Sequence, residues 1–438
     1  MPSLGDQLSA ALQSRDERLI RRRLSDAQAD AGLADFCTND YLSLAASPVL
    51  RARFLAALAA APHVLGSGGS RLLVNGPAHA ALEARLARLF AAPAALLFNS
   101  GFDANVGLFS AIPQPRDALL FDEHIHASVH DGMRASRVAP AMRRAFAHNS
   151  VAALRDVLAR LVAEHPDLQT GARSAFLAVE SLYSMDGTVC PLTEMVEAME
   201  ELLPCGNGYV VVDEAHATGI YGPQGRGLVA LLGLEHRVLA RLHTFGKALA
   251  GTGAVLLTTP LIRDYLLNYA RSLIYTTSLS YANIISVDCS FDLLEDGTAA
   301  RLAHQLSALV SHFLTLLRPR LHTIPLSLLA LPPHLAHAPS PSAPLHRTLP
   351  SPIIPLLTPY PRPLSAHLRA LGLNARPITW PTVPKGRERV RVCLHAGNSR
   401  EEVERLVAGM VEWAERWQRE NGGAGEQIVG GGQVAAKL

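Results

Sequence analysis

The chain has few cysteines, no long apolar run and almost no net charge. Its five cysteines are scattered, without a Cys-x-x-Cys pair, so they indicate neither a disulfide framework nor a zinc site and suit a reducing compartment. No apolar stretch is long enough to span a membrane. A net charge of +2 argues against nucleic acid or an anionic membrane as the main partner. With 438 residues, the chain can bury one large core and a smaller domain.

Lysine is scarcer still. Only three of the 40 basic residues are lysines, at positions 247, 385 and 437. A few lysines remain in any protein by chance. Arginine, however, solvates a surface equally well and cannot lose its proton to form an imine, whereas lysine can. The bias therefore favours a chemical role for Lys247.

Short, continuously apolar runs alternate with helical segments from residue 94 onward. We expect strands at residues 95–98, 118–121, 175–179, 209–212, 239–242 and 254–257, and helices at 79–92, 150–165 and 192–203. Strands that are apolar on both faces and joined by crossovers predict an α/β fold with a mostly parallel sheet. In such sheets ligands bind outside the carboxyl ends of the strands.

Polar residues stand at the ends of these expected strands. They are the Ser100-Gly101-Phe102 turn, His126, Ser184, Asp213 with His216, and Thr244 with Lys247. Each has a plain alternative, because the turn and Asp213 could cap helices and His126 could be a surface histidine. Their convergence on successive strand ends favours one site.

The stretch from Gly208 to Lys247 indicates a cofactor. A pyridoxal 5′-phosphate (PLP) enzyme needs a carboxylate for the pyridine nitrogen, a donor to the ring and an amine for the Schiff base, and Asp213, His216 and Lys247 could supply them. Backbone N–H groups at Gly101 and Phe102 would hold the phosphate at a helix start. The flat imidazole of His126 could stack on the ring.

Eight ordered motifs resemble the α-oxoamine synthase family of fold-type-I PLP enzymes over about residues 35–415. They are Asn39-Asp-Tyr-Leu-Ser-Leu44, Gly66-Ser-Gly-Gly-Ser-Arg71, Phe98-Asn-Ser-Gly-Phe102, Asp122 to Ser128, Glu180-Ser-Leu-Tyr-Ser-Met-Asp-Gly187, Val212-Asp-Glu-Ala-His-Ala-Thr-Gly219, Thr244-Phe-Gly-Lys247 and Pro381-Thr-Val-Pro-Lys-Gly386. The resemblance implies a large domain with a mostly parallel mixed sheet, a smaller α+β domain, and a homodimer with shared active sites.

The resemblance also implies roles by position. Lys247 would bind the cofactor covalently, His126 would stack on it and Asp213 would pair with its ring nitrogen. His216 and Ser184 would lie near the ring hydroxyl. The cofactor phosphate would be held by Ser100, Gly101, Phe102 and Thr244 of the same subunit. Thr276 and Thr277 would reach the phosphate bound in the partner subunit. Substrates would be bound by Arg391 at the α-carboxylate, Asn39 and Ser70 in the site wall, and Arg21 at a carboxylate of the acyl chain.

The implied reaction is the decarboxylative condensation of an amino acid with an acyl-CoA. The segments 381–386 and 389–397 are most similar to members that join L-alanine to pimeloyl-CoA in biotin biosynthesis. Two alternatives are another member with a different amino acid or acyl-CoA, such as a glycine C-acetyltransferase, an aminolevulinate synthase or a natural-product enzyme, and a catalytically silent binding subunit. Three departures concern the acyl pocket: Thr379-Trp380 in place of an expected arginine, Asn398 in place of a histidine, and a short loop after Gly76.

We expect four regions: an N-terminal segment (1–50), a PLP-binding domain (51–290), a small domain (291–420) and a flexible tail (421–438). Residues 324–363 are rich in Pro, Ser and His and predict an exposed, partly extended loop. Residues 1–23 predict a surface helix, although they also resemble a mitochondrial transit helix. The terminal Ala436-Lys437-Leu438 is a close variant of Ser-Lys-Leu and predicts a peroxisomal import receptor as partner, with cytoplasm and mitochondrion as alternative locations.

Overall fold

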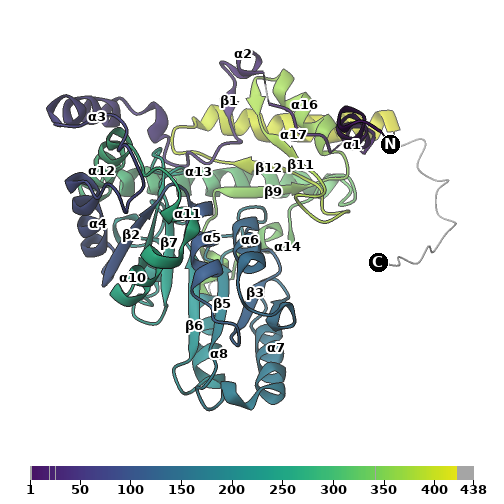
Figure 1. Cartoon of the computed structure of the whole chain (residues 1–438). Coiled ribbons are helices and arrows are strands. Elements are labelled where there is room, and N and C mark those ends of the chain that lie inside the picture. Colours follow the sequence, from purple (N-terminus) through teal and green to yellow (C-terminus); the bar gives the residue numbers. More distant parts are fainter. Residues whose placement is uncertain (1, 19, 25, 341, 422–438) are drawn as a thin grey trace.

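A large and a small β-sheet organise the molecule (Figure 1). The computed structural model describes residues 2–18, 20–24, 26–340 and 342–421. The terminal tripeptide 436–438 therefore lies outside the described residues. Within the described chain, no helix combines the length and apolarity that crossing a membrane requires.

The large sheet runs in the order β2-β8-β7-β6-β5-β3-β4. Its strands are β2 (Ala94–Phe98), β3 (Ala118–Asp122), β4 (Arg143–Phe146), β5 (Ala175–Glu180), β6 (Gly208–Asp213), β7 (Ala240–Thr244) and β8 (Ala254–Thr258). The strands from β7 to β4 are parallel, whereas β8 runs antiparallel to both β7 and β2. The predicted α/β fold with a mostly parallel sheet is confirmed. Strand β4 was not expected, because Arg143 and Arg144 interrupt the apolar pattern at the sheet edge.

Helices alternate with these strands along the chain, and several of them begin at a side-chain cap. They are α4 (Pro77–Leu89), α5 (Gly101–Ala111), α6 (Ala127–Ala135), α7 (Val151–Glu164), α8 (Leu192–Leu202), α9 (Gly227–Leu231), α10 (Pro260–Tyr269) and α11 (Arg271–Ile274). Ser150, for example, accepts a hydrogen bond from the Ala153 N–H and caps α7, whose Leu154, Leu158 and Leu161 are buried. The helices expected near residues 79–92, 150–165 and 192–203 are confirmed.

The small sheet has the antiparallel order β11-β12-β9. Its strands are β9 (Ile353–Leu357), β11 (Arg376–Ile378) and β12 (Arg389–Cys393), and α16 (Pro361–Ala370) and α17 (Arg400–Asn421) lie on its side away from the large sheet (Figure 1). The long helices α12 (Tyr281–Glu295) and α13 (Thr298–Arg320) lead to it, and α13 packs on α17.

The N-terminal segment joins the small sheet's region. It holds α1 (Leu4–Glu17), α2 (Ala27–Asp30) and β1 (Ala34–Asp35), whereas the next helix, α3 (Pro48–Ala60), packs on α12. Strand β1 pairs in parallel with β10 (Leu373–Asn374). Helix α1 is capped by Ser3, and all its residues are exposed or half-buried, so the predicted surface helix is confirmed.

The expectation for residues 324–363 is wrong in part. This stretch contains α14 (Pro333–Ala336), α15 (Leu345–Thr348) and the buried strand β9. Ile353, Ile354 and Leu356 are fully buried because β9 pairs along its whole length with β12. The proline-rich composition concealed this short apolar run.

Candidate active site

The carboxyl ends of β5, β6 and β7 bring the central residues together. Asp213 ends β6, where its Cα is paired with Glu180 of β5 on one side and Leu242 of β7 on the other. Strand β7 then leads through Thr244 to Lys247. The predicted convergence of strand-end groups is therefore present around Asp213 and Lys247.

Lys247 has an amine that is easily deprotonated. Burial of the ammonium group lowers its pKa to about 8. The carboxyl groups of Asp213 and, to a smaller extent, Glu180 oppose this shift, and the Arg391 guanidinium adds to it. A lysine that loses its proton near neutral pH can act as a nucleophile and as a base.

Asp213 is held as a hydrogen-bond acceptor. Only 7% of the residue is exposed. The Asn105 amide of α5 donates to Oδ2 at 2.8 Å, and the Ala215 N–H donates to Oδ1 at 2.9 Å. Asn105 also donates to Ser128 Oγ at 3.0 Å, which ties the aspartate to the start of α6. Asn105 was not singled out from the sequence, because a mid-helix asparagine carries no local signal.

His126 presents a ring with an open face. It caps α6 by accepting a hydrogen bond from the Ser128 N–H at Nδ1, 3.2 Å away. The residue is exposed, and its ring packs edge-to-face with Phe102 at 6.3 Å between centroids. Although part of the residue is open to solvent, desolvation by the surrounding protein lowers the pKa of His126; Asp213 raises this pKa and Lys247 lowers it. A neutral, flat imidazole near Asp213 and Lys247 suits stacking on an aromatic ligand.

His216 is buried and is tied to the N-terminal segment. Its Nδ1 lies 2.7 Å from the Tyr41 hydroxyl, which also contacts Asn39 Oδ1 at 3.1 Å. Burial lowers the pKa of His216 well below its usual value. Arg391 Nη2 donates to the same Asn39 oxygen at 3.1 Å. Tyr41, which the sequence placed only inside a motif, thus links His216 to Arg391 through Asn39.

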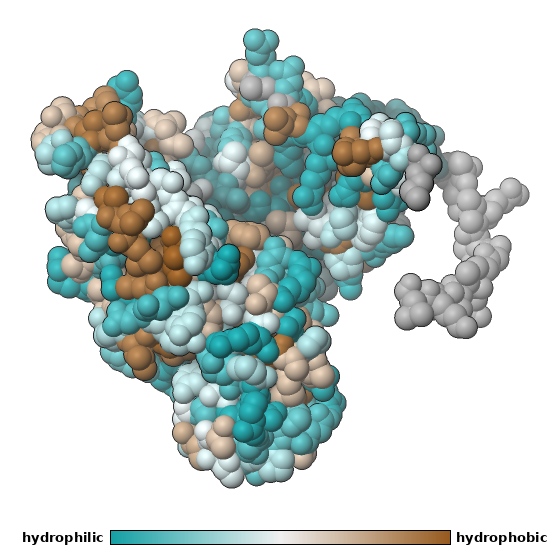
Figure 2. Space-filling model, viewed as in Figure 1, coloured by the Kyte–Doolittle hydropathy of each residue, from teal (hydrophilic) through white to brown (hydrophobic). Residues whose placement is uncertain are grey.

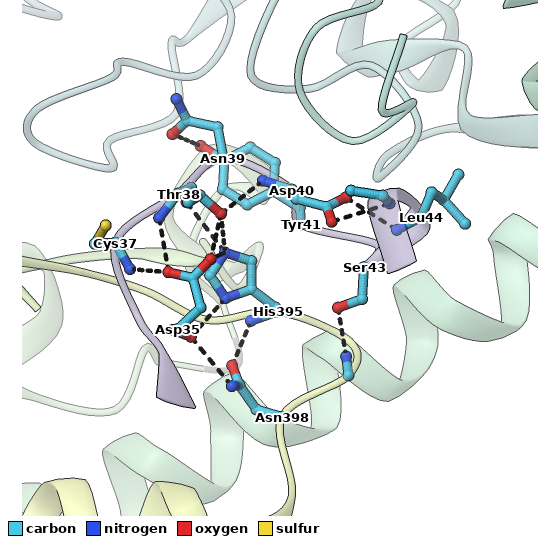
Figure 3. A network of polar contacts seen from close by, with 12 residues as sticks. Asp35, Cys37, Thr38, Asn39, Asp40, Tyr41, Ser43, Leu44, His395 and Asn398 are labelled. Atoms are coloured by element: carbon cyan, nitrogen blue, oxygen red, sulfur yellow. Dashed lines mark hydrogen bonds and ion pairs between the residues drawn. The ribbon is translucent and has the colours of Figure 1, made fainter. Parts of the chain in front are cut away.

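The segment that carries Asn39 and Tyr41 is fastened to the loop after β12 (Figure 3). His395 contacts the Asp35 carbonyl at 2.9 Å through Nδ1 and the Thr38 carbonyl at 3.1 Å through Nε2. Asn398 accepts from the His395 N–H at 2.8 Å and donates to the Asp35 carbonyl at 3.2 Å. Asn398, at a position where the family resemblance suggested histidine, therefore holds this fastening.

Arg391 and Ser184 meet across the two sheets. Arg391 lies on β12, is 6% exposed, and donates from Nε to the Ser184 carbonyl at 2.6 Å. Its charge lowers the pKa values of both His216 and Lys247. The guanidinium thus lies close to the amine and imidazole, where a planar fork can bind a carboxylate.

The start of α5 forms a turn suited to a phosphate. Ser100 caps the helix by accepting from the Asp103 N–H at 3.1 Å. A Cβ at Gly101 would lie 3.6 Å from Thr244 Cβ, so Gly101 and Thr244 are neighbours. Helix N-termini bind anions through free N–H groups and the helix dipole. Thr276 and Thr277 lie beside this turn, where the Asn99 amide donates to Thr276 Oγ1 at 3.3 Å and to the Thr277 carbonyl at 2.5 Å.

These groups fit PLP. The Lys247 amine of lowered pKa can form the Schiff base, and the Asp213 carboxylate can hold a proton on the pyridine nitrogen. The Gly101 turn and Thr244 can hold the phosphate. A buried carboxyl oxygen, Oε1 of Glu180, has no hydrogen-bond partner among the described residues, as expected where a ligand completes a site.

Residues 31–410 match the family of aminotransferases of class I and II. The chain is 47% identical to an 8-amino-7-oxononanoate synthase of Emericella nidulans, over 95% of this chain and 97% of the relative. It is 41% identical to the aminoacyl transferase sphA of Aspergillus fumigatus, over 87% of this chain and 80% of the relative. The fold matches a serine palmitoyltransferase of S. paucimobilis bound to a PLP–myriocin aldimine, with a TM-score of 0.74, 22% identity, and coverage of 95% and 98%.

The chain belongs to the class I and II aminotransferase family. Within it, the chain is an α-oxoamine synthase and an acyltransferase, and its cofactor is PLP. The family resemblance inferred from the eight motifs is confirmed.

A cavity of about 470 Å³ lies between the N-terminal segment and the small domain of this α-oxoamine synthase. Trp380 lines it, with the Arg18 guanidinium 5.9 Å and the Lys385 ammonium 5.3 Å from the ring centroid. Ile20, Tyr360 and three prolines form the apolar part of its wall. Arg362 and Glu388 also line it, so the cavity combines charged groups of both signs, mostly cations, with an apolar wall.

Two residues expected to bind substrate, Arg21 and Ser70, have their described contacts away from Lys247. Arg21 is exposed and paired with Asp16 at 2.5 Å, and Arg18, three residues earlier at the C-terminal end of α1, lines the cavity. Ser70 lies in a turn whose neighbour Gly69 pairs with Ser278. None of the contacts of Arg21 or Ser70 reaches the group around Lys247.

Proposed function

We propose that the protein condenses L-alanine with pimeloyl-CoA to give 8-amino-7-oxononanoate, CoA and CO2. The 47% identity to a relative of that name supports the reaction. This identity is the observation that carries the proposal, and the cavity beside Trp380, with Arg18 and Lys385 in its wall, is the proposed place for the acyl chain.

Lys247 is the proposed Schiff-base lysine and general base. When bound, PLP supplies the electron sink for the carbanion at the amino acid's Cα. The Lys247 amine, whose pKa is about 8, takes the proton from this carbon and later returns one. Asp213 would keep the proton on the ring nitrogen, His126 would cover the ring, and His216 and Ser184 would lie near its hydroxyl group.

Arg391 and Asn39 are proposed to bind the amino acid's α-carboxylate. Arg391 already donates to Asn39 Oδ1 and to the Ser184 carbonyl, which fixes the plane of its guanidinium. Ser100, Gly101, Phe102 and Thr244 hold the phosphate. The hydrogen bonds that fasten residues 35–44 to the loop at His395 hold the segment that carries Asn39 in place (Figure 3).

The cavity distinguishes between acyl donors. A chain that ends in a carboxylate would gain charge-assisted contacts with Arg18 and Lys385, which a neutral chain cannot make. Apolar contacts with Ile20 and Trp380 suit the methylenes. A monocarboxylic acyl donor, or an amino acid other than alanine, is the second candidate, which the 41% identity to sphA supports.

The test is CoA release by the PLP-loaded enzyme. We expect release with L-alanine and pimeloyl-CoA, and a much lower kcat/KM with heptanoyl-CoA, which has the same length without the terminal carboxylate. Glycine and serine serve as alternative amino acids. Failure of the pimeloyl-CoA pair, with release from another pair, would refute the biotin assignment and leave the PLP chemistry in place.

We further propose a homodimer, formed through the segments 65–73 and 275–281. Leu65, Leu73 and Tyr275 expose between 72% and 81% of their surfaces. The two segments are joined by hydrogen bonds from the Ser278 and Tyr281 N–H groups. Apolar side chains gather on this side of the molecule, over α10 and α11 (Figure 2). Burial of this face would bring Thr276 and Thr277 to the partner's phosphate, and analytical ultracentrifugation of Leu73→Glu would test it.

Peroxisomal localisation is proposed from Ala436-Lys437-Leu438 alone. A fluorescent protein fused to the N-terminus should enter peroxisomes, and the same fusion without the last three residues should stay in the cytoplasm. Entry of both fusions would refute this role for the tripeptide.

A further inference from the structure

Glu180 is a buried acid next to the cofactor site, and the roles proposed above do not use it. It ends β5, where its Cα is paired with that of Asp213 at the end of β6. Only 2% of the residue is exposed. Neighbouring strands lie about 4.8 Å apart, so two carboxyl groups stand side by side at one edge of the sheet.

The protein donates far less to Glu180 than to its neighbours. Each Asp213 oxygen accepts a hydrogen bond shorter than 3.0 Å, from Asn105 or from the Ala215 N–H. Glu180 accepts only from the Ser184 N–H, at 3.3 Å on Oε2, and its Oε1 is buried without a partner in the part of the chain that the structure describes. A carboxylate with so few donors is costly to bury.

Glu214, which follows Asp213, shows that this shortage is local. It is fully buried too, yet it accepts from Ser181 Oγ at 2.7 Å and from the N–H groups of Leu228 at 3.0 Å and Val229 at 2.6 Å. Glu214 therefore has hydrogen-bond donors on both carboxyl oxygens, whereas Glu180 has one long contact.

Burial and the neighbouring carboxylates also favour the protonated form of Glu180. Burial raises its pKa well above the ordinary value, and Asp213 and Asp122 on the flanking strands raise it further, whereas Lys247 lowers it. Two carboxyl groups on neighbouring strand ends cannot both ionise cheaply. Of the two, Asp213 has the hydrogen-bond donors that stabilise a negative charge, from Asn105 and the Ala215 N–H.

Glu180 is also connected to the carboxylate-binding arginine. The Ser184 N–H donates to Glu180, and the carbonyl of the same residue accepts from Arg391 Nε at 2.6 Å. Ser184 thus makes one hydrogen bond with a residue of the large sheet and one with a residue of the small sheet. A shift of Glu180 would move the residue against which Arg391 is aligned.

We propose that Glu180 is a positioning residue that keeps its proton in the working enzyme. As a neutral acid it anchors Ser184, and through Ser184 it aligns Arg391 for the amino acid's carboxylate. It leaves Asp213 as the negative charge that faces the cofactor's ring nitrogen. The alignment step rests on the proposed role of Arg391, whereas the protonation state does not.

The protonation state is tested in the cofactor-free protein. The pH midpoint of Lys247 acylation reports the charge around the amine. Glu180→Gln should leave this midpoint within about 0.3 pH units of the wild type, and Asp213→Asn should lower it by about one unit or more. A midpoint lowered as far by Glu180→Gln as by Asp213→Asn would show that Glu180 is ionised and would overturn the proposal.

Two further measurements complete the test. At neutral pH the infrared difference spectrum of wild type minus Glu180→Gln should contain the carbonyl band of a protonated carboxylic acid, and a carboxylate band in its place would overturn the proposal. In steady-state kinetics Glu180→Ala should raise the KM for the amino acid about tenfold with little change for the acyl-CoA, and Glu180→Gln should restore it to within about threefold. An equal rise in both KM values, or no restoration, would refute the alignment role. If the tested acyl-CoAs fail as substrates, the acylation and infrared results still decide the protonation state.

Discussion

The lowered pKa of Lys247 can be measured directly, because the chain has only three lysines. At pH 7 an amine of pKa about 8 is about 9% neutral, whereas one with the ordinary value of 10.5 is about 0.03% neutral. The neutral fraction is thus raised about 300-fold, and its pH midpoint moves down by about 2.5 units. Burial of the amine is the main cause, opposed by the Asp213 carboxylate.

Trace acylation with acetic anhydride measures this midpoint. The cofactor-free protein would be labelled across a pH series from about 6 to about 11, with Nα-acetyl-lysine amide as internal standard, and each lysine peptide quantified by mass spectrometry. We expect a midpoint near 8 for Lys247, and protection of Lys247 when PLP is bound. A midpoint within about one unit of that of the standard would refute the reasoning that burial outweighs the nearby carboxylates.

Two other substitutions test the acyl cavity and the turn between the sheets. Arg18→Ala should raise the KM for pimeloyl-CoA about three- to tenfold and leave that for heptanoyl-CoA unchanged, because it removes one cation beside Trp380. Arg23→Ala, which removes only an exposed contact with Asp16, is the matched control, and equal effects of both variants on both donors would contradict the assignment. Gly187→Ala should lower the free energy of unfolding by more than about 2 kcal/mol, because Gly187 has a φ of +63° and a Cβ there would collide with the Ile353 carbonyl oxygen. Gly206→Ala, at a φ of +73° with open space around it, should cost about 1 kcal/mol, and urea unfolding that shows equal losses would refute the collision.

The local sequence pattern was sufficient to predict most strands of the large sheet and several helices. The runs at residues 95–98 and 209–212 are apolar on both faces because the strands β2 and β6 are covered on both sides, so their type can be read without knowing their neighbours. Strand β9 could not be read in this way. Its short apolar run lies within a proline-rich stretch, and its burial depends on pairing with β12.

The sequence by itself determined the strand-end chemistry of this protein, with Asp213, His216 and Lys247 placed where parallel strands present their carboxyl ends. Only the tertiary structure decided which distant groups complete the site. Tyr41 meets His216 across 175 positions, and Asn39 meets Arg391 across 352. Such contacts follow from the order of the strands and the closure of the N-terminal segment on the small domain, which no local periodicity encodes. The lowered pKa of Lys247 and the bare oxygen of Glu180 likewise arise from burial, a property of the packed molecule.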